Sequence, residues 1–171
     1  MSVRALATGS RRAVVAFCTI AGAMATLTGC APGLNSVVAI GVDGQGHLVG
    51  AVKVCDHSIS RASLSPILAE GQQTTYTYWN RSQPLDHEEA WRLDVPTSGS
   101  WKLDGSLPTF TPGGVYGFTA QSSNGAYQGQ FLQFAGAQLA QLSSSQFLVS
   151  TKGTDPRVIP RIELSKQPCP W

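Results

Sequence analysis

Charge is scarce in this chain of 171 residues, of which only 13% are Asp, Glu, Lys or Arg. The 12 basic residues outnumber the 10 acidic ones, but Arg4, Arg11 and Arg12 lie close to the N-terminus. Without those three, the remainder has 9 basic and 10 acidic residues and a net charge of −1. No cluster of Lys or Arg remains to follow a phosphate backbone, so the composition argues against nucleic-acid binding.

The chain also lacks the usual motifs of catalytic and metal sites. It contains no Gly-x-Ser-x-Gly string, which a serine hydrolase would place between a strand and a helix. Its acidic and histidine residues gather in three places that do not show the spacing of zinc ligands: Asp43/His47, Asp56/His57 and Asp86–Glu89. We therefore expect no catalytic residue, no metal and no cofactor.

Long hydrophobic runs are absent as well. The longest, from Ala13 to Leu27, has about 15 residues, whereas a helix needs about 20 to cross a bilayer. Arginines precede this run and small residues end it, which is the arrangement of a secretory signal rather than of a membrane span. The sequence therefore predicts an exported protein.

The run ends at Leu27-Thr28-Gly29-Cys30, which resembles the lipobox of bacterial lipoproteins. The resemblance implies cleavage before Cys30, thioether lipidation of Cys30 and a membrane-anchored domain on the extracytoplasmic face. Ser10–Val15 partly resembles a twin-arginine export motif, and the general secretion route stays open. We expect a signal peptide over residues 1–29, a short tether over 30–36 and one domain over 37–171.

Cysteine usage fits that compartment. Of the four cysteines, Cys18 lies in the signal and Cys30 is the implied lipid acceptor, so Cys55 and Cys169 have only each other as partners. An oxidising compartment favours a disulfide between them, and free thiols are the alternative. The chain-entropy model gives a bridge over such a long loop about 4.7 kcal/mol of stabilisation.

Beyond the tether, the pattern is one of strands and turns. Val37–Val42 and His47–Cys55 flank a Gly-rich turn and predict a β-hairpin. Val115–Ala120 and Ala126–Phe134 predict a second hairpin, whose Asn124-Gly125 pair favours a type I′ turn. Shorter strands are expected in six places: Ile59–Leu64, Thr74–Asn80, Glu89–Val95, Ser100–Leu103, Phe147–Ser150 and Val158–Leu164.

Helix is limited to two short candidates, Ser65–Glu70 and Ala135–Leu142. The number and spacing of the expected strands are typical of a β-sandwich or barrel. We expect an all-β fold, a single β-sandwich (immunoglobulin-like or similar) with at most one or two short helical turns.

The domain resembles small β-rich lipoproteins of high-GC Gram-positive bacteria, through its Asp43–Gly46 turn and the positions of Cys55 and Cys169. That resemblance implies no functional residues.

The aromatic residues are the best candidates for a binding surface. Tyr76 and Tyr78 share one face of an expected strand, Trp79 lies on the other, and Trp91 and Trp101 lie on neighbouring strands. Exposed Tyr and Trp side chains can stack on sugars or anchor a protein interface. The alternative is that these residues fill the core.

Three functional hypotheses follow. The first is a membrane-anchored, non-catalytic interaction or accessory module of the cell envelope, with an envelope protein as partner. The second is a module that binds cell-wall glycan or a small ligand. The third is an envelope enzyme that uses Asp56/His57 or Asp86–Glu89, or a Cys55–His57 pair two residues apart on one strand face.

Overall fold

A computed structural model describes residues 33–68, 76–150 and 155–170. The predicted signal peptide, Cys30 and the first part of the tether lie outside the described residues. Ala31–Trp171 forms a compact unit separate from Met1–Cys30. Both hydrophobic clusters and the disulfide of the described chain lie within this unit, so we expect it to fold alone.

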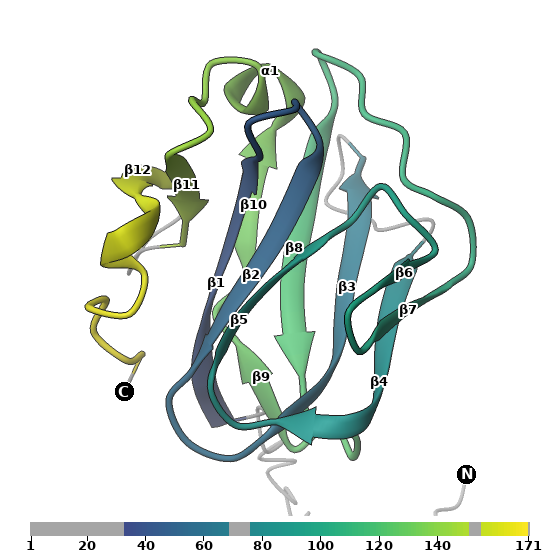
Figure 1. Ribbon diagram of the computed structural model, residues 1–171, viewed down its shortest axis with the longest axis vertical. Coiled ribbons are helices and arrows are strands. Elements are labelled where there is room, and N and C mark those ends of the chain that lie inside the picture. The colour runs from purple at the N-terminus through teal and green to yellow at the C-terminus, as the bar shows by residue number, and fades with distance from the viewer. Residues whose placement is uncertain (1–32, 69–75, 151–154, 171) are drawn as a thin grey trace, which may run out of the picture. The chain divides into compact units, whose positions relative to one another are not determined.

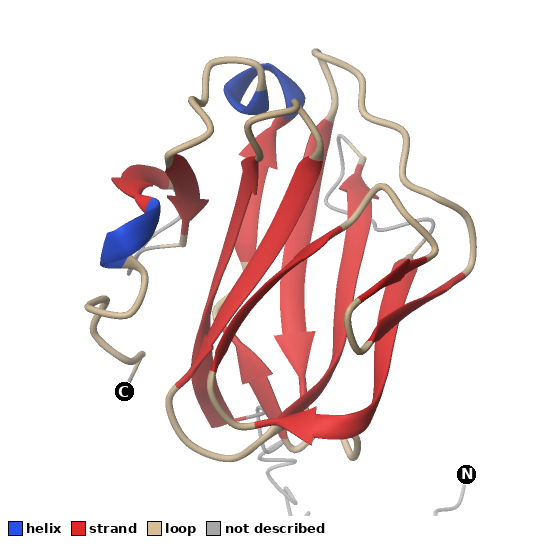
Figure 2. Ribbon diagram, in the orientation of Figure 1, coloured by secondary structure: helices blue, strands red, loops and turns tan. Residues whose placement is uncertain are grey.

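The regular structure of the described chain is mostly β-strand, as predicted (Figure 2). Its strands, in chain order, are β1 (Gly33–Val42), β2 (Leu48–Val54), β3 (Ile59–Ile67), β4 (Thr77–Leu85), β5 (Glu88–Arg92), β6 (Thr97–Ser98), β7 (Trp101–Asp104), β8 (Val115–Gln121), β9 (Tyr127–Gly129), β10 (Leu132–Ala135), β11 (Gln146–Val149) and β12 (Arg157–Pro160). The helical elements are one turn of α-helix, α1 (Gly136–Leu139), and one 3₁₀ turn, η1 (Arg161–Glu163).

The strands form one sheet that folds back on itself into a nearly closed sandwich (Figure 1). One layer contains β5, β2 and β1, with β11 and β12 continuing beyond β1. The other contains β10, β8, β3, β4, β7 and β6 in that order. Strand β9 links the layers, because it pairs in parallel with β1 and antiparallel with β8.

The main core lies between the two layers. Alternate residues of each strand point inward, such as Val38 and Ile40 of β1 and Leu64 of β3, all at most 2% exposed. They pack against inward residues of the other strands in a single cluster. Burial of this apolar surface is the main stabilising contribution to the domain.

A second cluster covers the outer face of β1 and β2. Val37, Ala39, Val49 and Ala51 pack there against apolar residues of β11, β12 and the C-terminal segment. Strand β1 is therefore buried on both faces, which explains why Val37–Val42 is a continuous apolar run instead of an alternating one. The predicted Cys55–Cys169 disulfide is present, with 5.9 Å between the Cα atoms, and holds the C-terminal segment on this face.

Several boundaries differ from the sequence prediction. Strand β1 begins at Gly33, so residues 33–36 belong to the sheet and not to the tether, and Asn35 and Ser36 are buried there. Ser65–Ile67 continue strand β3 rather than starting a helix, because they pair with Gly117, Tyr116 and Val115 of β8. The last two residues of that predicted helix lie outside the described chain.

The predicted strand Val158–Leu164 divides into β12 and η1. The second hairpin also differs from its prediction, because its return segment divides into β9 and β10. The turn at Ser122–Gly125 is not type I′, since Gly125 has a positive φ of 69° but Asn124 does not. Ser122 accepts a hydrogen bond from the Gly125 amide, and the Asn124 side chain accepts one from Ala126. The Ser122 amide donates to the Tyr127 carbonyl, so the four residues Ser123–Ala126 connect the two strands, with Gly125 in a left-handed conformation.

Candidate functional site

The tryptophans of the predicted binding surface are core residues, and that part of the prediction was wrong. Trp79, Trp91 and Trp101 are between 0% and 3% exposed. The rings of Trp91 and Trp101 stack with their centroids 4.0 Å apart. A two-layer sandwich of this size needs large inward side chains to fill the space between the layers, and the tryptophans supply that volume.

The two predicted tyrosines lie on the outer face of the second layer. Tyr76 and Tyr78 stack with centroids 5.6 Å apart and planes inclined by 14°. Tyr76 is 41% exposed, and Tyr78 is half-buried. Strand alternation produces this arrangement, because residues two apart in an extended chain point to the same side.

Small residues form a floor beside these rings. Ser63 lies opposite Tyr78 on one side and Thr119 on the other, and Ser65 lies opposite Gly117. Phe131 bounds the far side: a Cβ atom on Gly117 would lie only 2.2 Å from Cζ of Phe131, so the ring lies over the bare glycine backbone. Sequence reasoning missed Phe131 and the serines, because only the strand register brings them to the tyrosines.

We call the resulting depression the tyrosine groove. It has a volume of about 430 Å³, within the range of about 300–1,000 Å³ typical of small-molecule sites. Its lining residues are Ser63, Ser65, Tyr76, Tyr78, Gly117, Thr119, Gln121, Gln128 and Phe131. Two aromatic walls thus enclose a floor of hydroxyl and amide groups, none of them charged.

Two charged side chains nearby, Arg61 and Asp104, are linked through the amide of Asn80. Arg61 lies over the Tyr78 ring at 5.2 Å from its centroid, and its Nε donates a hydrogen bond of 2.8 Å to Asn80 Oδ1. Asn80 Nδ2 in turn donates to Asp104 Oδ2 at 3.3 Å. By contrast, the side chains of Ser63, Ser65, Gln121 and Gln128 make no hydrogen bond within the described part of the chain, so their polar atoms are available to a ligand.

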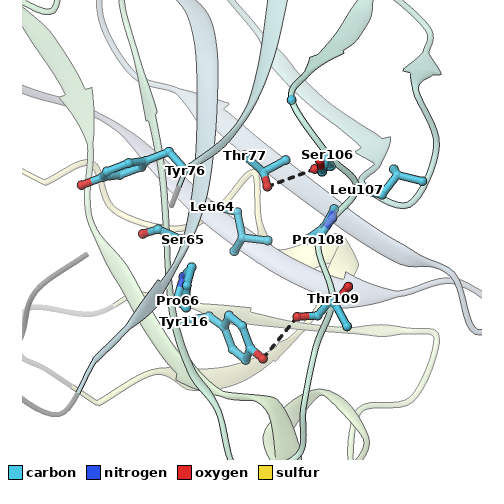
Figure 3. Close-up of a pocket in the computed structure, with 11 residues that line it drawn as sticks. Leu64, Ser65, Pro66, Tyr76, Thr77, Ser106, Leu107, Pro108, Thr109 and Tyr116 are labelled. Atoms are coloured by element: carbon cyan, nitrogen blue, oxygen red, sulfur yellow. Dashed lines mark hydrogen bonds between the residues drawn. The ribbon is translucent and has the colours of Figure 1, made fainter. Parts of the chain in front are cut away.

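A second depression opens beside the groove, at the end of β3 and β4 (Figure 3). We call it the apolar pocket. It has a volume of about 410 Å³ and is lined by Leu64, Ser65, Pro66, Tyr76, Thr77, Gly105, Ser106, Leu107, Pro108, Thr109 and Tyr116. Ser65 and Tyr76 line both depressions, so the two are contiguous.

Hydrogen bonds hold the loop that forms one wall of this pocket. Thr77 Oγ1 donates to the Ser106 carbonyl at 3.2 Å. The Tyr116 hydroxyl accepts from the Thr111 amide at 2.7 Å and donates to the Thr109 carbonyl at 3.4 Å (Figure 3). The loop is thus fixed to β4 and β8, and the pocket is already formed without a ligand.

The Cys and His residues that the sequence suggested as members of reactive pairs make local contacts in the structure. Cys55 is in the disulfide and supplies no thiolate for a pair with His57. His57 stacks on Tyr127 at 3.7 Å and lies 3.4 Å from Asp56, and His87 lies 2.9 Å from Asp86 on the exposed β4–β5 turn. Among the described residues, no three His, Cys, Asp or Glu side chains gather closely enough to hold a metal ion.

One charged cluster was not expected. His47 Nδ1 lies 2.7 Å from Asp94 Oδ2, and Arg92 donates two hydrogen bonds to the same carboxylate. Partial burial raises the pKa of Asp94, but the hydrogen bonds from Arg92 and His47 outweigh it and hold that pKa below its ordinary value of 3.8. The cluster joins the β1–β2 turn to the end of β5. His47 and Asp94 are 47 residues apart in the chain, so no local sequence pattern indicates the cluster.

Within the described ranges, no helix has the length and apolar character needed to cross a membrane. Comparison with known proteins gives no relative: no protein-family model matches the chain, and neither a curated protein nor a solved structure matches it.

Proposed function

We propose that this protein is an exported lipoprotein, anchored through Cys30, that acts as a non-catalytic binding module of the cell envelope. The N-terminal arginines, the short apolar run and Leu27–Cys30 support export and anchoring. The groove of stacked tyrosines supports binding. A single acyl chain holds a protein only weakly at a membrane, whereas the diacylglyceryl group expected on Cys30 would anchor the module stably.

The ligand class that fits the tyrosine groove best is a neutral glycan. Sugar rings present apolar faces that stack on aromatic side chains and hydroxyl groups that pair with hydroxyls and amides. The groove combines both features, with Tyr76 and Tyr78 beside Ser63, Gln121 and Gln128. The single observation that carries this proposal is the stacked, partly exposed pair Tyr76–Tyr78 over an uncharged polar floor.

Calorimetric titration with neutral oligosaccharides from bacterial cell walls tests this binding. Replacing Tyr78 with Ala should weaken the affinity about tenfold, which corresponds to about 1.4 kcal/mol of binding free energy. Tyr127→Ala is the matched control, because Tyr127 stacks on His57 outside the groove. Equal losses in both variants, or no loss with Tyr78→Ala, would contradict a site in the groove.

The anchoring is tested separately. Mass spectrometry of the protein isolated from a bacterial envelope should show cleavage before Cys30 and a diacylglyceryl adduct on Cys30. A Cys30→Ala variant should leave the membrane fraction. Recovery of the unmodified chain, with the signal intact, would contradict the lipoprotein assignment.

A protein partner is the second candidate, favoured by the exposed apolar residues at the C-terminal edge of the sheet. Val158 and Ile162 are 51% and 79% exposed, and β12 is an outermost strand. Edge strands and apolar surface residues of this kind form protein contacts. Cross-linking in intact envelopes, followed by pull-down with Ile162→Asp as the comparison, should recover a specific protein that the variant loses.

A further inference from the structure

The tyrosine groove and the apolar pocket are neighbouring depressions of different chemical character. Ser65 and Tyr76 line both, so the two adjoin at these residues. Figure 3 shows Tyr76 on the same side of the pocket as Ser65, across from Leu107 and Pro108. A ligand long enough to pass Tyr76 would contact both depressions at once.

The pocket end is suited to a hydrocarbon. Leu64, Pro66, Leu107 and Pro108 contribute apolar surface, together with the Tyr116 ring. Two of its hydroxyl groups are engaged within the protein, since Thr77 binds the Ser106 carbonyl and the Tyr116 hydroxyl binds Thr109 and Thr111. An alkyl chain would displace water from the apolar surface and leave these hydrogen bonds intact.

The groove end is suited to an uncharged polar group. No side chain that lines either depression is charged, so the lining itself forms no ion pair with a phosphate or carboxylate. The side-chain amides, those of Gln121 and Gln128, lie at the groove end, whereas Leu64, Pro66, Leu107 and Pro108 lie at the pocket end. This asymmetry matches a molecule with a neutral, hydroxyl-rich head and an apolar tail.

The pocket and the start of β1 lie at opposite ends of the sandwich. The pocket lies at the Ile67 end of β3, whereas β1 begins, at Gly33, at the other end (Figure 1).

Resting on the proposed glycan site, we propose that the natural ligand is a neutral glycolipid, with its sugar in the tyrosine groove and its alkyl chain in the apolar pocket. Leu107, which is 45% exposed, lines the pocket and would be covered by the alkyl chain. A ligand that covers Leu107 would explain why this large apolar side chain is exposed beside a polar groove.

The test is a nuclear magnetic resonance titration of the ¹⁵N-labelled Ala31–Trp171 unit with methyl, hexyl and octyl glucoside below their micelle concentrations. Affinity should rise from methyl to octyl by up to about fourfold per added methylene. Methyl glucoside should shift groove amides such as Thr119, and the longer glucosides should also shift Ser106 and Leu107. Leu107→Asp should remove the dependence on chain length, and Val158→Asp, a similarly exposed position on β12, should leave it unchanged.

Equal affinity for the three glucosides, with shifts confined to the groove, would overturn the glycolipid inference and leave the glycan site standing. Equal binding of an octyl sulfobetaine would overturn the neutral sugar head. No shift at the groove with any glucoside or wall oligosaccharide would overturn the proposed function as well.

Discussion

Gly117 is the residue on which the shape of the tyrosine groove depends most directly. Its missing side chain lets the Phe131 ring lie over the sheet, and even one methyl group would collide with that ring. Phe131 is 41% exposed, so its ring can swing outward into solvent at little cost to the fold.

Gly117→Ala should therefore lower ligand affinity about tenfold while changing the melting temperature by no more than a few degrees. The control is Gly44→Ala, where nothing lies within 4 Å of the added methyl group. Isothermal titration with wall oligosaccharides and a thermal melt measure the two effects. An unchanged affinity in Gly117→Ala would show that Phe131 does not bound the site.

A second prediction at this scale concerns Asp94. Its pKa is lower in the folded state than in the unfolded chain, so its ionisation stabilises the fold. This contribution is present in full above the ordinary pKa of 3.8 and disappears as the pH falls through the lower folded-state value. Because the side chain is 34% exposed, we expect Asp94→Asn to cost less than about 1 kcal/mol at pH 7.

Denaturant unfolding between pH 7 and pH 2 measures this contribution. The difference in unfolding free energy between the wild type and Asp94→Asn should stay constant down to about pH 4 and then shrink. A difference that grows on acidification would contradict the direction of the pKa shift.

At the scale of single elements, the two hairpin turns show how far local sequence determines structure. Asp43–Gly46 and Ser122–Gly125 both form turns where the Gly-rich sequence predicts them. The turn type at Asn124-Gly125 could not be predicted, because Asn124 does not have the positive φ of a type I′ turn and its side chain accepts a hydrogen bond from the Ala126 amide. Only Gly125 takes the left-handed conformation.

Gly125→Ala should thus destabilise the domain by about 1 kcal/mol, since an L-residue at a φ of 69° is strained. Gly113→Ala is the matched control: it lies in a loop with open space around its Cβ position and does not have a positive φ. Urea unfolding compares the two variants. Equal stability of Gly125→Ala and the wild type would show that the turn relaxes to another type.

Strand β3 shows where local signals mislead. Ser65 followed by Pro66 is typical of the start of a helix, yet both residues are in the sheet opposite Gly117 and Tyr116. Pairing with β8 supplies the burial and hydrogen bonds that a two-turn helix there would lack. Placing Ser65 in the groove therefore required the register, which the sequence alone does not indicate.

At the scale of the whole molecule, the predicted all-β sandwich and the Cys55–Cys169 bridge are confirmed, and the surface was only partly predictable. Alternation along the strand correctly placed Tyr76 and Tyr78 on one face and Trp79 on the other. Aromatic content alone could not separate surface from core: Trp91 lies inside against Phe118, and Trp101 lies inside stacked on Trp91. Long-range pairing decides which aromatic residues reach solvent.

The disulfide links the C-terminal segment to the outer face of β1 and β2, so its removal should affect the whole domain. A Cys55→Ala, Cys169→Ala double variant should lose about 2–5 kcal/mol of unfolding free energy. Hydrogen exchange should show the earliest loss of protection in β12 and the residues that follow it. Uniform loss of protection across the sandwich, or no loss of stability, would contradict this role.

The most direct test of the central claim, that the tyrosine groove is the ligand site of this domain, is to map amide shifts while wall oligosaccharides are added to the ¹⁵N-labelled Ala31–Trp171 unit. Saturable shifts should concentrate at Ser63, Tyr78 and Thr119 and vanish in Tyr78→Ala. Shifts centred on β12 and Ile162, or none at saturating glycan, would contradict the account.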